Sequence, residues 1–122
     1  MDLYRDEILD HYKNPHNFGG LENPTAEHEE YNPLCGDQMK LQIKVSEGKV
    51  TEAGFTGEGC AISVAAASIL TDYIKGKSLD ELRKLDAKGD LKILNMEDIS
   101  PARLKCALLS FEALKKLLAN GI

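Results

Sequence analysis

The stretch Gln38–Val45 constrains the fold more than any other part of the sequence. Its apolar residues alternate strictly with polar ones, as Gln-Met-Lys-Leu-Gln-Ile-Lys-Val. A period of two is typical of a β-strand with one face on a core and the other in water. We therefore expect a half-buried strand whose apolar face needs a covering layer.

The segments on either side of this strand extend the sheet. Residues 46–49, Ser-Glu-Gly-Lys, are typical of a hairpin turn, and a return strand is expected over 50–56. The apolar phase changes between Val50 and Phe55, which predicts a bulge near Glu52. Residues 27–31 are expected to pair as an edge strand.

Helical patterns account for most of the remaining chain. Asp2 is a suitable cap for a helix through Lys13, with Tyr4, Ile8 and Tyr12 as its apolar stripe. A second helix is expected over 61–75, with Gly76 as its stop.

The C-terminal third is expected to hold two further helices. Ser78 and Glu81 match a capping box for a short helix. Residues 86–98 are expected to form a loop with a turn or two of helix. Ser100-Pro101 opens the last helix, whose dominant apolar face comprises Leu104, Ala107, Leu108, Phe111, Leu114 and Leu118.

Length and charge limit the class of protein. The 122 residues suit one domain, 1–122, and a net charge of −5 argues against a nucleic-acid binder, which needs a basic footprint. No apolar run approaches the roughly 20 residues of a membrane span, and residues 1–7 do not resemble a signal peptide. We therefore expect a cytoplasmic protein.

The three cysteines occur in three separate contexts. An odd number in a reducing compartment argues against a disulfide framework, and three buried thiols acting as small hydrophobes are the simplest alternative. Cys60, flanked by Gly57 and Gly59, precedes a helix, where free N–H groups favour a thiolate. Cys106 points about 130° away from the dominant face of its helix.

The third context, Cys35-Gly36-Asp37, combines a thiol and a carboxylate across a glycine turn. An Asx-type turn entering the strand would explain Asp37 equally well if this tripeptide stood alone. Together, Cys35, Asp37, Cys60 and Cys106 make a four-ligand set that suits tetrahedral zinc or an iron–sulfur centre. Lys105 and Arg103 lie close enough in sequence to offset part of its negative charge.

At these residues the sequence resembles the IscU/SufU family, which includes the N-terminal domain of NifU. The resemblance spans nearly the whole chain. It rests on Tyr4–Tyr12, Asn14–Gly19, Asn32–Asp37, Gly57–Ser63 and Lys105–Ser110.

The resemblance implies an α+β fold, a small three-stranded antiparallel sheet packed against helices (SufE/IscU-like). It implies that Cys35, Asp37, Cys60 and Cys106 bind Zn²⁺ or iron in a transient [2Fe–2S] cluster. The implied partners are a cysteine desulfurase and apo iron–sulfur acceptor proteins.

The sequence departs from both subfamilies. IscU-type scaffolds carry histidine before the third cysteine and a Leu-Pro-Pro-Val-Lys motif recognised by a dedicated Hsp70 chaperone. Here Lys105 and Ile99–Arg103 occupy those positions, so the resemblance does not imply that chaperone as a partner. A lysine before the third cysteine, here Lys105, is similar to the residue at that position in SufU-type proteins. However, the segment between Cys60 and Cys106 is shorter than in SufU-type proteins.

Three functions follow as hypotheses. The first is a scaffold, rather than a turnover enzyme, that accepts sulfur and assembles and transfers a [2Fe–2S] cluster. The second is a SufU-type zinc-dependent sulfurtransferase, in which Cys35 or its rival Cys106 takes a persulfide. The third is a structural-zinc interaction module. His11, His16 and His28 lack metal-ligand spacing to any cysteine and are interpreted as surface or packing residues.

Overall fold

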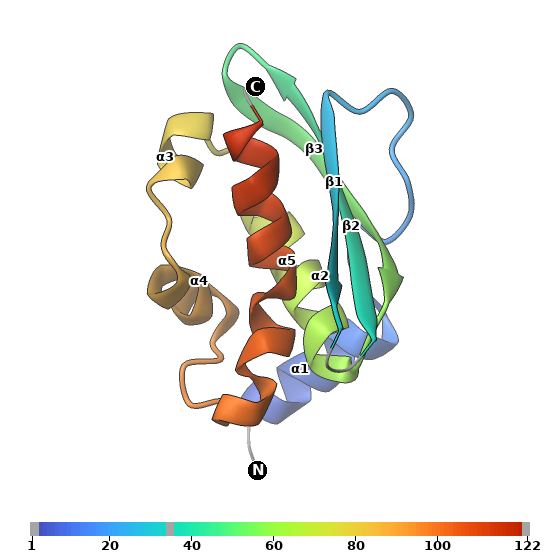
Figure 1. Ribbon diagram of the computed structural model, residues 1–122, viewed down its shortest axis with the longest axis vertical. Coiled ribbons are helices and arrows are strands. Elements are labelled where there is room, and N and C mark those ends of the chain that lie inside the picture. Colours follow the sequence, from blue (N-terminus) through green and yellow to red (C-terminus); the bar gives the residue numbers. More distant parts are fainter. Residues whose placement is uncertain (1–2, 34–35, 121–122) are drawn as a thin grey trace.

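The computed structural model of the protein, which describes residues 3–33 and 36–120, has a sheet on one side and helices on the other (Figure 1). In chain order the elements are α1 (Leu3–Lys13), β1 (Ala26–Asn32), β2 (Asp37–Ser46), β3 (Lys49–Glu58), α2 (Ala61–Ile74), α3 (Leu79–Arg83), α4 (Ala87–Leu94) and α5 (Pro101–Ala119). The predicted α+β class is therefore confirmed, with a three-stranded antiparallel sheet in the order β1-β2-β3.

The sheet confirms the apolar face of the central strand, although Gln42, which was expected to face water, is buried. Met39, Leu41 and Ile43 on β2 are fully buried, whereas Val45 is only partly buried. Lys44 pairs with Glu52 while Val45 pairs with Val50, so Thr51 is the extra residue of a bulge. The bulge therefore lies next to the position that the change of phase predicted, and it turns both Val50 and Phe55 toward the core.

The central helix of the structure is α2. It packs against α1, α4, α5 and β3, and α5 in turn covers β1 and β2 (Figure 1). The apolar residues of α2 that recur at helical spacing, Ile62, Ala65, Ala66, Ile69 and Tyr73, predict a single buried stripe. The buried surface is wider than that stripe, because Ser63, Ser68 and Thr71 are also fully buried. Each of these hydroxyls makes a hydrogen bond, which makes its burial tolerable.

The C-terminal helices mostly follow their sequence signals. Ser78 Oγ accepts a hydrogen bond from the N–H of Glu81, as a capping box requires. Residues 86–98 contain α4, which is capped by Asp86. Ser100 precedes Pro101 at the start of α5, but its hydroxyl makes no capping hydrogen bond, contrary to expectation.

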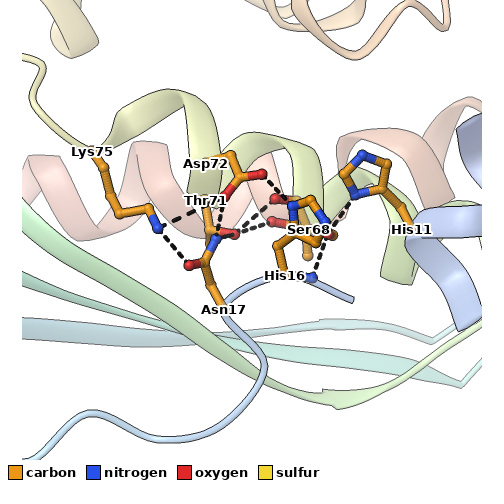
Figure 2. Close-up of polar contacts among 8 residues, drawn as sticks. His11, His16, Asn17, Ser68, Thr71, Asp72 and Lys75 are labelled. Carbon is orange, nitrogen blue, oxygen red and sulfur yellow. Dashed lines mark hydrogen bonds and ion pairs between the residues drawn. The ribbon is translucent and has the colours of Figure 1, made fainter. Parts of the chain in front are cut away.

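The N-terminal helix α1 packs against α2, and His11 of α1 and the residues just after α1 make polar contacts with α2 (Figure 2). The expected apolar stripe of α1 is wrong at Tyr12, which is 45% exposed, whereas Ile8 is buried. The expected cap Asp2 lies outside the described residues. His16 donates from Nδ1 to Asp72, 2.5 Å away, and Asn17 donates to Thr71 and Asp72.

This polar network also affects Asp72 itself. Partial burial alone would raise the pKa of Asp72, but hydrogen bonds from His16 and Asn17 hold that pKa below its ordinary value. Within the described residues, no helix is both long enough and apolar enough to cross a membrane.

Candidate metal centre

Cys60 is the residue that caps the N-terminus of α2. Its backbone is extended and its side chain makes no capping hydrogen bond, so the thiol is not used to satisfy the helix end. The side chain is exposed. This position confirms the predicted placement of Cys60 at a helix start, next to unpaired N–H groups.

Cys106 lies on α5, away from the main apolar face of that helix. It is half-buried, and its neighbours on the same side of α5, Leu109 and Ala113, are buried. Cys106 also packs against the main hydrophobic core, so the prediction that it faces something other than that core is confirmed only in part. Its thiol also lies beside Asp37 and Cys60.

Asp37 is the first residue of β2 and pairs with Asn32 of β1. Only 6% of it is exposed, although a carboxylate is costly to bury. Ser63 of α2 offsets part of this cost, because its Oγ donates a hydrogen bond to Asp37 Oδ2 at 2.5 Å. A buried acid with a dedicated donor indicates a carboxylate held in a set position.

These three residues converge. One carboxylate oxygen of Asp37 and the Sγ atoms of Cys60 and Cys106 all lie within 4.8 Å of one another. They come from a strand and two different helices, so the fold rather than local sequence brings them together. Two thiols and a carboxylate are ligands that zinc and iron accept, and the donor set fits either metal.

The remaining predicted ligand, Cys35, lies outside the described residues. Across this gap, the N–H of Gly36 donates a hydrogen bond to the carbonyl of Asn32 at 2.8 Å. Gly36 has a φ of 75°, a left-handed conformation that suits glycine. The role of Cys35 as a ligand stays a prediction.

The predicted neighbours of the site have different placements. Arg103 and Lys105 are exposed on α5, and Lys105 lines a cavity of about 320 Å³ between α5 and β1. That they offset the charge of the ligands stays a prediction. His11 and His16 pack against α2 through Ser68 and Asp72.

Sequence reasoning missed one residue of the site, Ser63, and it did not predict that Gly59 makes room for the contact between Ser63 and Asp37. The hydroxyl of Ser63 also lies 3.6 Å from Cys60 Sγ. A Cβ atom on Gly59 would lie 2.9 Å from Ser63 Cβ and 3.2 Å from Asp37 Cγ. A serine three residues after a cysteine that caps a helix is the signal that was present, but its partner lies 26 residues earlier in the chain.

Comparison with known proteins identifies the family of this chain. The profile of the NifU-like N terminal domain family matches residues 3–120. The chain is 40% identical to the zinc-dependent sulfurtransferase SufU of Bacillus subtilis, over 97% of this chain and 90% of that protein. It is 36% identical to the iron–sulfur cluster assembly scaffold protein IscU of Escherichia coli, over 96% and 92% of the two chains.

The fold is shared with a solved structure. The N-terminal part of a nitrogen-fixing NifU-like protein from Brucella abortus superimposes with a TM-score of 0.79 at 24% identity, covering 96% of this chain and 92% of that one. A family profile that matches almost the whole chain, together with these identities, settles membership. The chain belongs to the family of NifU-like N-terminal domains.

Proposed function

We propose that this protein is an iron–sulfur cluster assembly scaffold, which accepts sulfur from a cysteine desulfurase and assembles and transfers a [2Fe–2S] cluster. The observation that carries the proposal is the convergence of Asp37, Cys60 and Cys106 within 4.8 Å. It is supported by the match to scaffold proteins named IscU over nearly the whole chain. Cys35 is proposed as the fourth ligand.

The chemistry of the ligand set suits a cargo that must later leave. Thiolates bind iron strongly, whereas Asp37 supplies a hard oxygen ligand that binds a soft cluster weakly. We therefore propose that Asp37 is the ligand that allows the cluster to leave the protein. The cluster is the cargo of the protein, and apo iron–sulfur proteins are its proposed recipients.

Sulfur would enter as a persulfide. A thiolate of this protein attacks the outer sulfur of the desulfurase persulfide, a new S–S bond forms, and the desulfurase cysteine leaves as a thiolate. Cys35 is the proposed acceptor, and Cys106 is its rival. Trapping the persulfide and locating it by mass spectrometry would distinguish the two.

A second candidate function is zinc-dependent sulfur transfer without cluster assembly. The observations that favour it are the 40% identity to the Bacillus subtilis zinc-dependent sulfurtransferase SufU and the lysine, Lys105, before the third cysteine. Zinc at the same residues would hold the thiols as thiolates. The same protein would then pass on sulfur alone.

One experiment separates the two functions. The purified protein, with and without bound zinc, is mixed anaerobically with a cysteine desulfurase, cysteine and ferrous iron, and ultraviolet–visible and Mössbauer spectra are recorded. A [2Fe–2S] spectrum and cluster transfer to an apo-ferredoxin would support the scaffold. Retained zinc, faster desulfurase turnover and no cluster would support the sulfurtransferase and contradict the scaffold.

A further inference from the structure

Ser63 is a buried hydroxyl in contact with two of the proposed ligands. Its Oγ donates to Asp37 Oδ2 at 2.5 Å and lies 3.6 Å from Cys60 Sγ, and the residue is fully buried. Ser63 is the third residue of α2, a position from which a polar side chain often reaches back to the helix cap. Here the side chain is directed to a carboxylate of the sheet instead.

Gly59 provides the space for this contact. A methyl group at Gly59 would press on Ser63 Cβ at 2.9 Å and on Asp37 Cγ at 3.2 Å. Gly59 is not among the glycines with positive φ, so the backbone itself would accept an alanine. The requirement for glycine is therefore one of space, and it applies to the Ser63–Asp37 pair.

We propose that Ser63 is a positioning residue of the metal centre, which holds the carboxylate of Asp37 in the orientation that places one of its oxygens beside the two thiols. This inference rests on the proposed metal centre. Asp37 carries the oxygen ligand, and a ligand that binds more weakly than the thiolates contributes to affinity only when it is well oriented. Loss of such a supporting hydrogen bond typically costs 10–100-fold in metal affinity.

The pairing also explains why a carboxylate is stable here before any metal arrives. A carboxyl group with 6% exposure needs hydrogen-bond partners, and Ser63 supplies one from the first turn of α2. Because Ser63 has a single proton and gives it to Asp37, the thiol of Cys60 faces its oxygen rather than its proton. The hydroxyl thus links the conformations of two ligands.

The test is anaerobic titration with Co²⁺ alone, which gives thiolate-to-cobalt charge-transfer bands and d–d bands sensitive to coordination. Ser63→Ala is compared with wild type, with Asp37→Ala and with the double variant. Ser110→Ala is the matched control, because Ser110 is also a buried serine on a helix but has no hydrogen-bond partner among the described residues. Thermal melting followed by circular dichroism verifies that each variant is folded.

The expected result is a dissociation constant for Co²⁺ raised roughly 10- to 100-fold in Ser63→Ala, with altered d–d bands. Ser110→Ala should match wild type, and Ser63→Ala should have no further effect in the Asp37→Ala background. Gly59→Ala, which keeps both polar groups but crowds them, should alter the d–d bands in the same way and replaces Ser63→Ala if that variant does not fold.

Two results would overturn the role of Ser63 while leaving the metal centre intact. One is an unchanged affinity and d–d spectrum in Ser63→Ala, or in Gly59→Ala if it is used instead. The other is an equal loss of affinity with and without Asp37, because Ser63 would then act only through packing. Wild-type protein without thiolate-to-cobalt bands would overturn the metal centre itself, and with it the role of Ser63.

Discussion

Ser68 Oγ lies 2.7 Å from His11 Nδ1, so a fully buried hydroxyl of α2 contacts a side chain of α1 (Figure 2). The same oxygen accepts a hydrogen bond from the backbone N–H of His16, at 2.8 Å. A single serine therefore joins the first helix and the segment that follows it to the central helix.

Ser68→Ala is expected to destabilise the protein, because it removes the contacts of Ser68 Oγ with His11 and His16. It would leave the N–H of His16 without its buried acceptor, which costs about 1–3 kcal/mol in the free energy of unfolding. Urea unfolding measures the loss, and hydrogen exchange should show faster exchange of α1 amides in particular. Ser46→Ala, at an exposed residue near the hairpin, is the control and should change stability by less than about 0.5 kcal/mol. Equal exchange in α1 for wild type and Ser68→Ala would contradict the prediction.

Asp90 on α4 should make the protein less stable as pH rises. It is fully buried, its oxygens have no hydrogen-bond partner among the described residues, and burial raises its pKa from 3.8 to about 7. The folded state therefore binds a proton more tightly than the unfolded state, and stability declines between about pH 4 and pH 7. Over this range the loss is at most about 4 kcal/mol.

Asp90→Asn is expected to remove this pH dependence. The variant and wild type should have similar stability near pH 4, and the variant should be the more stable of the two at pH 8, by denaturant unfolding. Asp98→Asn changes the same charge at an exposed residue and should leave the pH profile of wild type intact. A profile for Asp90→Asn that runs parallel to that of wild type would show that Asp90 does not titrate in this range.

Gly57→Ala is expected to disrupt the end of the sheet next to the metal centre. Gly57 has a φ of 141°, and a Cβ atom there would lie 2.2 Å from the carbonyl oxygen of Gln38. Both the conformation and the collision oppose a side chain, so we expect a loss of at least about 2 kcal/mol. Thermal unfolding measures it. Gly20→Ala is the control, because the φ of Gly20 is not positive and a Cβ atom there would lie at an ordinary 3.4 Å from Gln42 Oε1. Equal melting temperatures for the two variants would contradict the prediction.

Asp37 is expected to set the rate at which metal leaves. Asp37→Cys supplies a softer ligand and should slow zinc transfer to a chelator by about tenfold or more, equivalent to about 1.4 kcal/mol. Asp37→Asn, which keeps an oxygen but loses the charge, should release zinc faster than wild type. Stopped-flow absorbance with a coloured chelator gives the three rates, and any order other than Cys, Asp, Asn from slow to fast would argue against Asp37 as the labile ligand.

Much of the fold was predictable because its signals are local. The alternation of Gln38–Val45, the capping box at Ser78 and the stop at Gly76 each depend on residues within a few positions of one another. Signals of this kind predicted the strands and helices, but not the depth at which each helix lies. For this reason the apolar stripe of the central helix α2 did not predict that its polar residues Ser63, Ser68 and Thr71 are buried as well.

The sequence by itself determined the elements of the site: a cysteine at a helix start, another turned away from the main face of its helix, and an aspartate at the beginning of a strand. Only the tertiary structure decided that Asp37, Cys60 and Cys106 meet within 4.8 Å and that Ser63 supports Asp37. The physical reason is the sequence separation between the interacting residues. Periodicity and capping reflect backbone sterics and hydrogen bonds between near neighbours, whereas a contact across 26 residues depends on how α2 and β2 pack.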